Sequence, residues 1–276
     1  MRRSEIITLA AALVLAGAAA IAEAPARVVS LNLCTDQMAL LLGAPGQVVG
    51  VTELAHDPRS SAMTEAAAGV PSHNASAEAV VLMRPDLVLA GTWTTRATVE
   101  MLERLGIPVV EFAPANSLDE ARAALLRMGA LLGREAQAAR IVADFDARLA
   151  ALADKTGPRP RAALYFPLNG TAGRQTLAGD ILAAAGIDNI AEARGLPYGG
   201  RLAMEELILD DPDLILVGQP YNGHARATEA LQHPALRATG ALRRIENGAA
   251  WVCETPALLD AVAEMVALRR DWERGR

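Results

Sequence analysis

Histidines that could hold a metal ion are few in this sequence and widely spaced. The four histidines are His56, His73, His224 and His233. No two of them stand four residues apart, and no loop is rich in histidine. A bare zinc or manganese ion needs several His and carboxylate ligands that converge. His56 with Asp57 is the best fragment of such a site, so direct binding of zinc or manganese remains an alternative, but we assign no metal ligand.

The two cysteines, Cys34 and Cys253, allow two different chemistries. In an exported protein, a disulfide is the ordinary expectation, although the sequence does not show whether these two residues meet. Alternatively, Cys34 lies near a predicted helix N-terminus and could be an activated thiol. No histidine partner for it is evident. A secreted enzyme that uses Cys34 is therefore kept as a less favoured alternative.

The motifs that mark common enzyme families are missing from the chain. A dinucleotide-binding enzyme would carry G-x-G-x-x-G after its first strand, but the first turn here, Leu31–Asp36, contains no glycine. The chain has neither a phosphate-binding P-loop nor a G-x-S-x-G nucleophile elbow. We therefore predict a binding protein and not an enzyme, with no catalytic residue and no cofactor of its own.

Composition and the first residues indicate export and exclude one class of partner. Lys+Arg number 26 and Asp+Glu 32, a net charge of −6 without a basic block, so nucleic acid is not an expected partner. Arg2 and Arg3 precede an uncharged run, Ile6–Ala22, that ends in a small-x-small cleavage pattern. As a helix this run would span about 25 Å, less than the ~30 Å hydrocarbon core. We expect residues 1–22 to be a signal peptide cleaved after Ala22, and the mature protein to be periplasmic.

From Arg27 onward, apolar runs typical of strands alternate with amphipathic helical stretches. Strands are predicted at 27–31, 47–51, 86–90, 108–112, 161–166, 214–217 and 249–253. Helices are predicted at 35–43 with Thr35 as the N-cap, 78–83, 99–105, from the capping box Ser117–Glu120 to Gly133, and at 177–185 and 256–274. This alternation predicts an α/β fold in which helices cover parallel sheets.

One long helix separates two such regions. Residues 134–156 carry an apolar stripe at helical spacing, and Thr156–Pro160 then breaks the helix. About 22 helical residues reach about 33 Å, close to the width of a small domain. We therefore predict an N-terminal α/β lobe at 23–133, a linking helix at 134–156 and a C-terminal α/β lobe at 157–276.

Two segments repeat one pattern on either side of this helix. Ala77–Ala90 and Met204–Val217 each contain a glutamate, then Pro-Asp, then an apolar strand. The glutamates, Glu78 and Glu205, stand in the first turn of a predicted helix, where the positive helix end favours a carboxylate. A fold shared by the two lobes explains the repeat by itself, and a role shared by the two carboxylates is the other interpretation.

Several motifs follow one another in the order found in a known family. They are R-V-V-S-L-N-L-C-T-D at 27–36, the Glu to Pro-Asp segment at 78–88, L-G-I-P-V at 105–109, the long helix and the second Glu to Pro-Asp segment. In these the chain resembles the periplasmic binding proteins for cobalamin and ferric siderophores that serve ABC importers. The resemblance implies two Rossmann-like lobes with parallel sheets, a single long α-helix that joins them, and a ligand cleft between the lobes.

The same resemblance implies a partner and the residues that bind it. In this family one surface glutamate on each lobe docks onto arginine clusters of a two-fold ABC permease in the inner membrane. Glu78 and Glu205 match those positions, with Glu206 directly beside the second. We expect the binding protein itself to be a monomer.

We predict the ligand-binding residues from a general property of open α/β sheets, which bind ligands beyond the carboxyl ends of their strands. The residues placed there are Asn32, Cys34, His56, Trp93, Tyr165 and Tyr221. Trp93 and Tyr198 also resemble in position the aromatic side chains of the cobalamin binder, and a flat chelate favours aromatic faces. Local packing is the alternative role for both. We predict an iron- or cobalt-containing metal chelate, a ferric siderophore or cobalamin, with haem as a further alternative.

Overall fold

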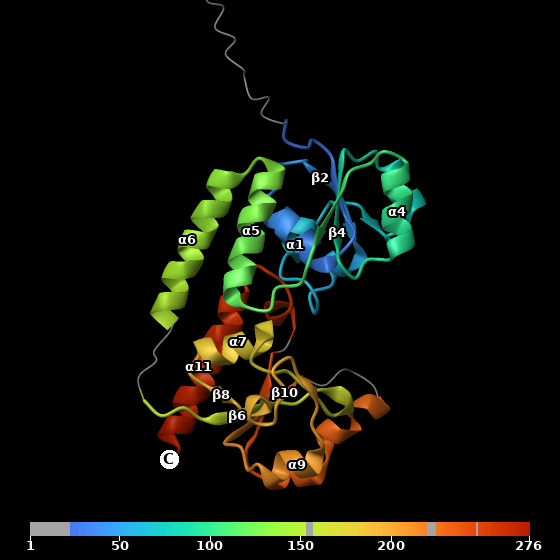
Figure 1. Cartoon of the computed structure of the whole chain (residues 1–276). Coiled ribbons are helices and arrows are strands. Elements are labelled where there is room, and N and C mark those ends of the chain that lie inside the picture. Colours follow the sequence, from blue (N-terminus) through green and yellow to red (C-terminus); the bar gives the residue numbers. More distant parts are fainter. Residues whose placement is uncertain (1–22, 153–156, 220–224, 247) are drawn as a thin grey trace, which may run out of the picture.

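Two parallel β-sheets organise the molecule (Figure 1). The computed structural model describes residues 23–152, 157–219, 225–246 and 248–276. The first sheet has the order β3-β2-β1-β4-β5, with β1 at Val28–Ser30, β2 at Val48–Thr52, β3 at Ser72–His73, β4 at Leu87–Gly91 and β5 at Val109–Phe112. The second has the order β11-β10-β6-β8, with β6 at Arg161–Leu164, β8 at Asp188–Asn189, β10 at Leu214–Gly218 and β11 at Leu242–Ile245. A separate antiparallel ribbon joins β7 at Gly170–Thr171 to β9 at Gly200–Arg201.

The first sheet is covered on both faces because its central strands are apolar and buried at almost every position. Leu89 of β4 belongs to an apolar cluster with α1 (Leu33–Leu42) and α5 (Leu118–Leu132). Val88, which points to the other face, belongs to a cluster with α3 (Ala77–Leu82) and α4 (Arg96–Arg104). Figure 1 shows α1 and α5 on one side of this sheet and α4 on the other. Two short elements, η1 (Glu53–His56) and α2 (Thr64–Ala67), complete this lobe.

The second sheet repeats this plan. Leu164 and Leu216 pack in one cluster with α7 (Leu177–Ala184) and α11 (Leu258–Arg274). Ala163 and Ile215 face the other way, toward α9 (Met204–Leu209), η3 (Arg226–Gln232) and α10 (Pro234–Ala238). The remaining short elements are η2 (Pro167–Asn169), α8 (Ile190–Ala193) and η4 (Ala249–Trp251). The predicted α/β fold with two parallel sheets is therefore confirmed.

Helix α6 at Glu135–Leu152 corresponds to the predicted linking helix. Gly133 ends α5 in the left-handed region, with φ at +66°, and α6 begins two residues later. Helix α6 packs along α5 and also contacts α11 of the second lobe (Figure 1). The predicted last residues of the linking helix, 153–156, lie outside the described residues. No helix in the described ranges is long and apolar enough to cross a membrane.

Two details of the predicted elements are wrong. The first helix is capped by Asn32, whose Oδ1 accepts a hydrogen bond from the Cys34 N–H at 2.9 Å. Thr35 lies inside the helix, and its hydroxyl bonds Ser30 instead. The apolar run 249–253 is a 3₁₀ turn and a bend, not a strand. The last strand is β11, which prediction missed because Arg243 and Arg244 interrupt its apolar pattern.

Candidate ligand-binding cleft and docking surface

Trp93 presents its indole to solvent at the carboxyl end of the first sheet, where a ligand is expected. Trp93 stands two residues after the end of the buried strand β4, and its side chain is 85 % exposed. The loop is held in place because the Gly91 N–H donates to the Thr94 hydroxyl and the Thr94 N–H donates to the Gly91 carbonyl. Asn32 lies beside this loop, since a Cβ on Gly91 would come within 2.9 Å of the Asn32 amide. The backbone is thus fixed while the indole remains available.

His56 is the other predicted residue on this side of the first lobe. It ends η1 and is exposed. The Asp57 carboxylate beside it accepts hydrogen bonds from the Arg59 N–H and the Ser60 hydroxyl, which lower the pKa of Asp57. Asp57 therefore stabilises the local turn. Within the described ranges, no three His, Cys, Asp or Glu side chains gather closely enough to hold a metal ion.

Tyr165 does not present its ring to a ligand, contrary to its predicted place among the ligand-binding residues. The side chain is completely buried in the cluster that also contains Ala163 and Leu207. Its hydroxyl donates to Asn169 Oδ1 at 2.9 Å. Burial raises the pKa of Tyr165, and the negative charge of Glu205 adds to this effect. Tyr165 therefore supports the end of β6 from inside.

Leu168 is exposed at this strand end, and sequence reasoning missed it. Leu168 and Asn169 both have a φ of +60°, a conformation that few residues other than glycine adopt. This turn leaves the Leu168 side chain 61 % exposed. The run P-L-N-G signals a turn, but nothing in the sequence marks its leucine as a surface residue.

Tyr198 is 73 % exposed and lines a groove of about 560 Å³. The other lining residues are Asn116, Ser117, Glu120, Arg174, Gln175 and Asp180. The groove therefore runs between the start of α5 and the second lobe. Gly199, the next residue, lies against the β7–β9 ribbon with φ at +93°, and a Cβ there would come within 2.3 Å of the Thr171 carbonyl oxygen.

Arg174 is held by an acidic neighbour inside this groove. Its guanidinium pairs with Asp180 at 2.7 Å, and the other oxygen of Asp180 accepts from the Leu118 N–H at 2.9 Å. Asp180 thus connects the N-terminus of α5 to the second lobe. Arg174 is still partly exposed, so an anionic ligand group could reach it.

A second groove, of about 270 Å³, lies where residues of both lobes meet. Pro58 and Arg59 come from the first lobe, and Gln219, Glu246 and 248–250 come from the second. The Gln219 amide donates to the Glu246 carboxylate at 2.9 Å. Tyr221, predicted to bind ligand, follows this strand end and lies outside the described residues.

A disulfide fastens the two lobes together. Cys34 in the first turn of α1 is bonded to Cys253 after η4, with their Cα atoms 4.9 Å apart and a sequence separation of 219. The disulfide interpretation is therefore confirmed, and the interpretation of Cys34 as an activated thiol is wrong, because a bonded sulfur is not a nucleophile. No free cysteine occurs in the part of the chain that the structure describes.

A buried carboxylate strengthens the same junction. Glu254, next to the disulfide, is 2 % exposed, and one of its oxygens accepts from the Ala115 N–H at 2.7 Å. Burial raises the pKa of Glu254. Its second oxygen has no hydrogen-bond partner among the described residues. The disulfide, Glu254 and Asp180 therefore all join the lobes on the α5 side.

The two echoed segments fold in the same way in detail. Asp86 accepts from the Arg27 N–H at the start of β1, and Asp213 accepts from the Arg161 N–H at the start of β6. The residue before each proline, Arg84 or Asp211, has a positive φ, at 51° and 46°. In both helices the fourth residue, Val80 or Leu207, is buried. The Pro-Asp part of the pattern is therefore structural.

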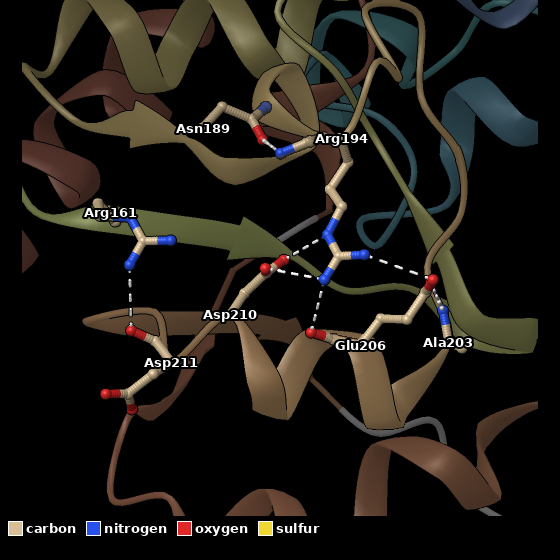
Figure 2. A network of polar contacts seen from close by, with 8 residues as sticks. Arg161, Asn189, Arg194, Ala203, Glu206, Asp210 and Asp211 are labelled. Carbon is tan, nitrogen blue, oxygen red and sulfur yellow. Dashed lines mark hydrogen bonds and ion pairs between the residues drawn. The ribbon is translucent and has the colours of Figure 1, made fainter.

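The glutamates of the pattern have no such structural task. Glu78 and Glu205 are exposed, and neither carboxylate has a hydrogen-bond or ion-pair partner among the described residues. Glu206, by contrast, accepts from the Ala203 N–H and pairs with Arg194 at 3.4 Å (Figure 2). Of the two adjacent glutamates, Glu205 is therefore the one whose carboxylate is available.

With this geometry established, comparison with known proteins identifies the family. A family model for periplasmic binding proteins matches residues 28–244. The chain belongs to the periplasmic binding protein family. Curated cobalamin-binding proteins from two strains of Halobacterium salinarum are 35 % identical to it over 217 residues, which are 76 % of this chain. The match spans 58 % of the length of those relatives.

Solved structures share the fold of this family member. A periplasmic heme-binding protein from Roseiflexus sp. RS-1, in apo form, is 23 % identical with a TM-score of 0.72, and the alignment covers 89 % of this chain and 98 % of that one. The periplasmic vitamin B12 binding protein of Vibrio cholerae is 18 % identical with a TM-score of 0.66, covering 91 % and 98 %. At these identities the likeness concerns the fold.

Proposed function

We propose that this chain is the substrate-binding component of an ABC importer and that it captures a metal chelate, with cobalamin as the first candidate. The observation that carries the proposal is the nearly free indole of Trp93, held on a fixed loop at the end of a central strand. A flat, partly apolar ligand is recognised by such a face. The 35 % identity to cobalamin-binding proteins favours a corrinoid over a ferric siderophore or haem.

The ligand would lie between Trp93 of the first lobe and the Tyr198 groove of the second. Leu168, at the end of β6, would add an apolar contact, and Tyr221 remains a proposed ligand residue. Asn32 and His56 are polar groups near the first-lobe strand ends, where they could orient a chelate. The disulfide between Cys34 and Cys253 would keep the lobes at one separation, so we propose a cleft that is largely preformed.

Delivery to an inner-membrane permease from the periplasm completes the proposed function. The signal peptide at 1–22, cleaved after Ala22, would export a monomer whose Glu78 and Glu205 dock onto a two-fold permease. Intact-mass analysis of the periplasmic protein tests the export. A chain that retains Met1 in the membrane fraction would contradict it.

Ligand identity is tested with purified protein and three separate probes: cyanocobalamin, haemin and a ferric hydroxamate. We expect isothermal titration to show tight binding of cyanocobalamin, and Trp93→Ala to weaken it. The matched control is Trp272→Ala, because Trp272 lies near the end of α11, beside the start of β6 and away from the strand ends where the ligand is proposed: a Cβ on Gly157 would lie 3.4 Å from the carboxylate of the adjacent Glu273. Binding of haemin or the hydroxamate alone would exclude cobalamin, and binding of none of the three would exclude the chelate proposal.

Docking is tested by Glu78→Ala combined with Glu205→Ala. We expect uptake of the ligand to fall by about tenfold or more, because paired charges set the register and rate of association, while ligand affinity stays unchanged. The control pair is Glu135→Ala with Glu192→Ala. These two substitutions remove an exposed glutamate from the first turn of α6 and from the first turn of α8. If both pairs transport normally, the glutamates serve only their helix ends and the docking assignment is wrong.

A further inference from the structure

Two leucines stand almost fully in solvent at equivalent positions of the two lobes. Leu82 is the last residue of α3 and is 83 % exposed, and Leu209 is the last residue of α9 and is 81 % exposed. Single exposed leucines are common on protein surfaces. A matched pair is different, because the lobes have diverged at other positions of the same helices, such as Ala79 and Glu206.

Each leucine shares a helix face with the free glutamate. Glu78 and Leu82 are four residues apart, as are Glu205 and Leu209. Residues at this spacing lie one above the other on a helix surface. Each lobe therefore presents the same outward pair, a carboxylate with no partner among the described residues and an isobutyl group one turn away.

The fold does not require leucine at these two positions. The fourth residue of each helix, Val80 or Leu207, makes the buried contact with the sheet. The Pro-Asp turn that follows is held by Asp86 and Asp213, which bind the backbone of the neighbouring strand. Folding thus accounts for the inward parts of the repeat, and the helix end favours a carboxylate in its first turn, but no contact among the described residues accounts for the exposed leucines.

We propose that Leu82 and Leu209 are the apolar half of the docking surface and insert into two equivalent apolar sockets, each rimmed by positive charge, on a two-fold symmetric membrane partner. This inference rests on the proposed function as an importer component. A partner with two copies of one surface matches a chain that carries two copies of one outward pair. The carboxylates steer the encounter and fix its register, and the leucines supply the part of the contact that excludes water.

The glutamate contacts and the leucine contacts should respond differently to salt, and this makes the proposal testable. Contacts between exposed charges weaken as salt screens them, whereas burial of an apolar side chain does not depend on charge. The experiment uses the full mature chain and the importer's membrane complex reconstituted in lipid nanodiscs, with affinity measured at low and at high salt. The variants are Leu82→Ser, Leu209→Ser, the double variant, and Glu78→Gln with Glu205→Gln.

Each single leucine variant should lose roughly tenfold in affinity for the complex, at both salt concentrations. The two losses should be similar and should multiply in the double variant, because the sites are on different lobes. The glutamine pair should lose affinity mainly at low salt. The control is Leu105→Ser with Leu126→Ser, two leucines of the first lobe that are 56 % and 44 % exposed and should leave docking unchanged.

A leucine double variant with wild-type affinity for the complex would overturn the inference while leaving the glutamate assignment intact. A loss caused equally by the control pair would also overturn it, because a general effect of surface polarity would then explain the result. Unchanged melting temperatures and unchanged cyanocobalamin affinity show that each variant is folded. Failure of the wild-type chain to bind the complex at all would instead contradict the proposed function.

Discussion

The helices α3 and α9 present the same residues outward but are stabilised in different ways. Helix α3 is capped by Ser76, whose hydroxyl accepts from the Ala79 N–H. The N-cap position of helix α9 is Ala203, which has no side-chain oxygen, and the Glu206 carboxylate accepts from the Ala203 N–H instead. Arg194 then binds both Glu206 and Asp210 (Figure 2).

This difference separates what the fold needs from what function needs. If the outward glutamate and leucine were by-products of one way of building the helix, they would change when the supporting residues changed. They remain the same while the cap, the third helix position and the nearby arginine all differ. The comparison therefore favours a separate binding partner that contacts the outward glutamate and leucine of both lobes.

The largest effect we expect comes from removing the bond that makes the two lobes one unit. Replacing Cys34 and Cys253 together by Ser should reduce the free energy of unfolding by about 2–4 kcal/mol, because the bond restrains a long segment of the unfolded chain. Urea denaturation followed by circular dichroism measures the loss. Thiol counting on the denatured wild type provides the control, and two free thiols would show that the lobes are not bonded.

A buried carboxylate of the first lobe should make stability depend on pH. Burial raises the pKa of Asp36 from 3.8 to about 6, although hydrogen bonds from Thr52 oppose the change. Because the folded pKa lies above the unfolded one, Asp36 contributes stability that is present below about pH 4 and is lost as the pH rises through about 6. Two pKa units correspond to about 3 kcal/mol.

The matched variant for this effect is Asp36→Asn, which keeps an acceptor for Thr52 and does not titrate. From about pH 4 to about pH 7, the stability of the wild type relative to the variant should fall by about 2–3 kcal/mol. Nearby His73 is also buried, which lowers its pKa, but it is present in both proteins and largely cancels in the difference. A difference that stays constant with pH would show that Asp36 titrates at its ordinary value.

The aromatic residues allow the two lobes to be compared in ligand binding. Replacing Trp93 or Tyr198 by Ala should each cost about 1–3 kcal/mol of binding free energy, as expected for an aromatic contact at the centre of an interface. Titration calorimetry with cyanocobalamin measures both. If only Trp93→Ala weakens binding, the ligand is held by the first lobe alone, and if neither does, both rings are surface residues without a ligand role.

Much of the architecture follows from local pattern in the sequence, and the errors have physical causes. The alternation of apolar strands and capped helices predicted the central strands of both sheets, because the apolar pattern of each of these strands indicates its burial. The edge strands β3, β8 and β11 were missed. Tyr165 was misplaced although it shares a strand face with Ala163, which should have indicated burial. The bond between Cys34 and Cys253 depends on how the lobes pack, and no local pattern reports a contact between residues 219 apart.

The smallest predicted effect tests the comparison of α3 and α9 directly. Glu206→Ala should cost about 0.5–1 kcal/mol, because α9 loses the carboxylate that accepts from the N–H of its N-cap residue, Ala203, and pairs with Arg194. Ala203→Ser gives α9 the cap that α3 already has, since Ala203 has the extended backbone that an N-cap residue requires.

In the background of Glu206→Ala, we therefore expect Ala203→Ser to recover most of the lost stability, measured by urea denaturation of the four proteins in the cycle. Uptake should remain normal in all four, because the available carboxylate is that of Glu205. Reduced uptake by Glu206→Ala would transfer the docking role to Glu206. No recovery by Ala203→Ser would mean that the contact with Arg194, and not the missing cap, is what Glu206 contributes to α9.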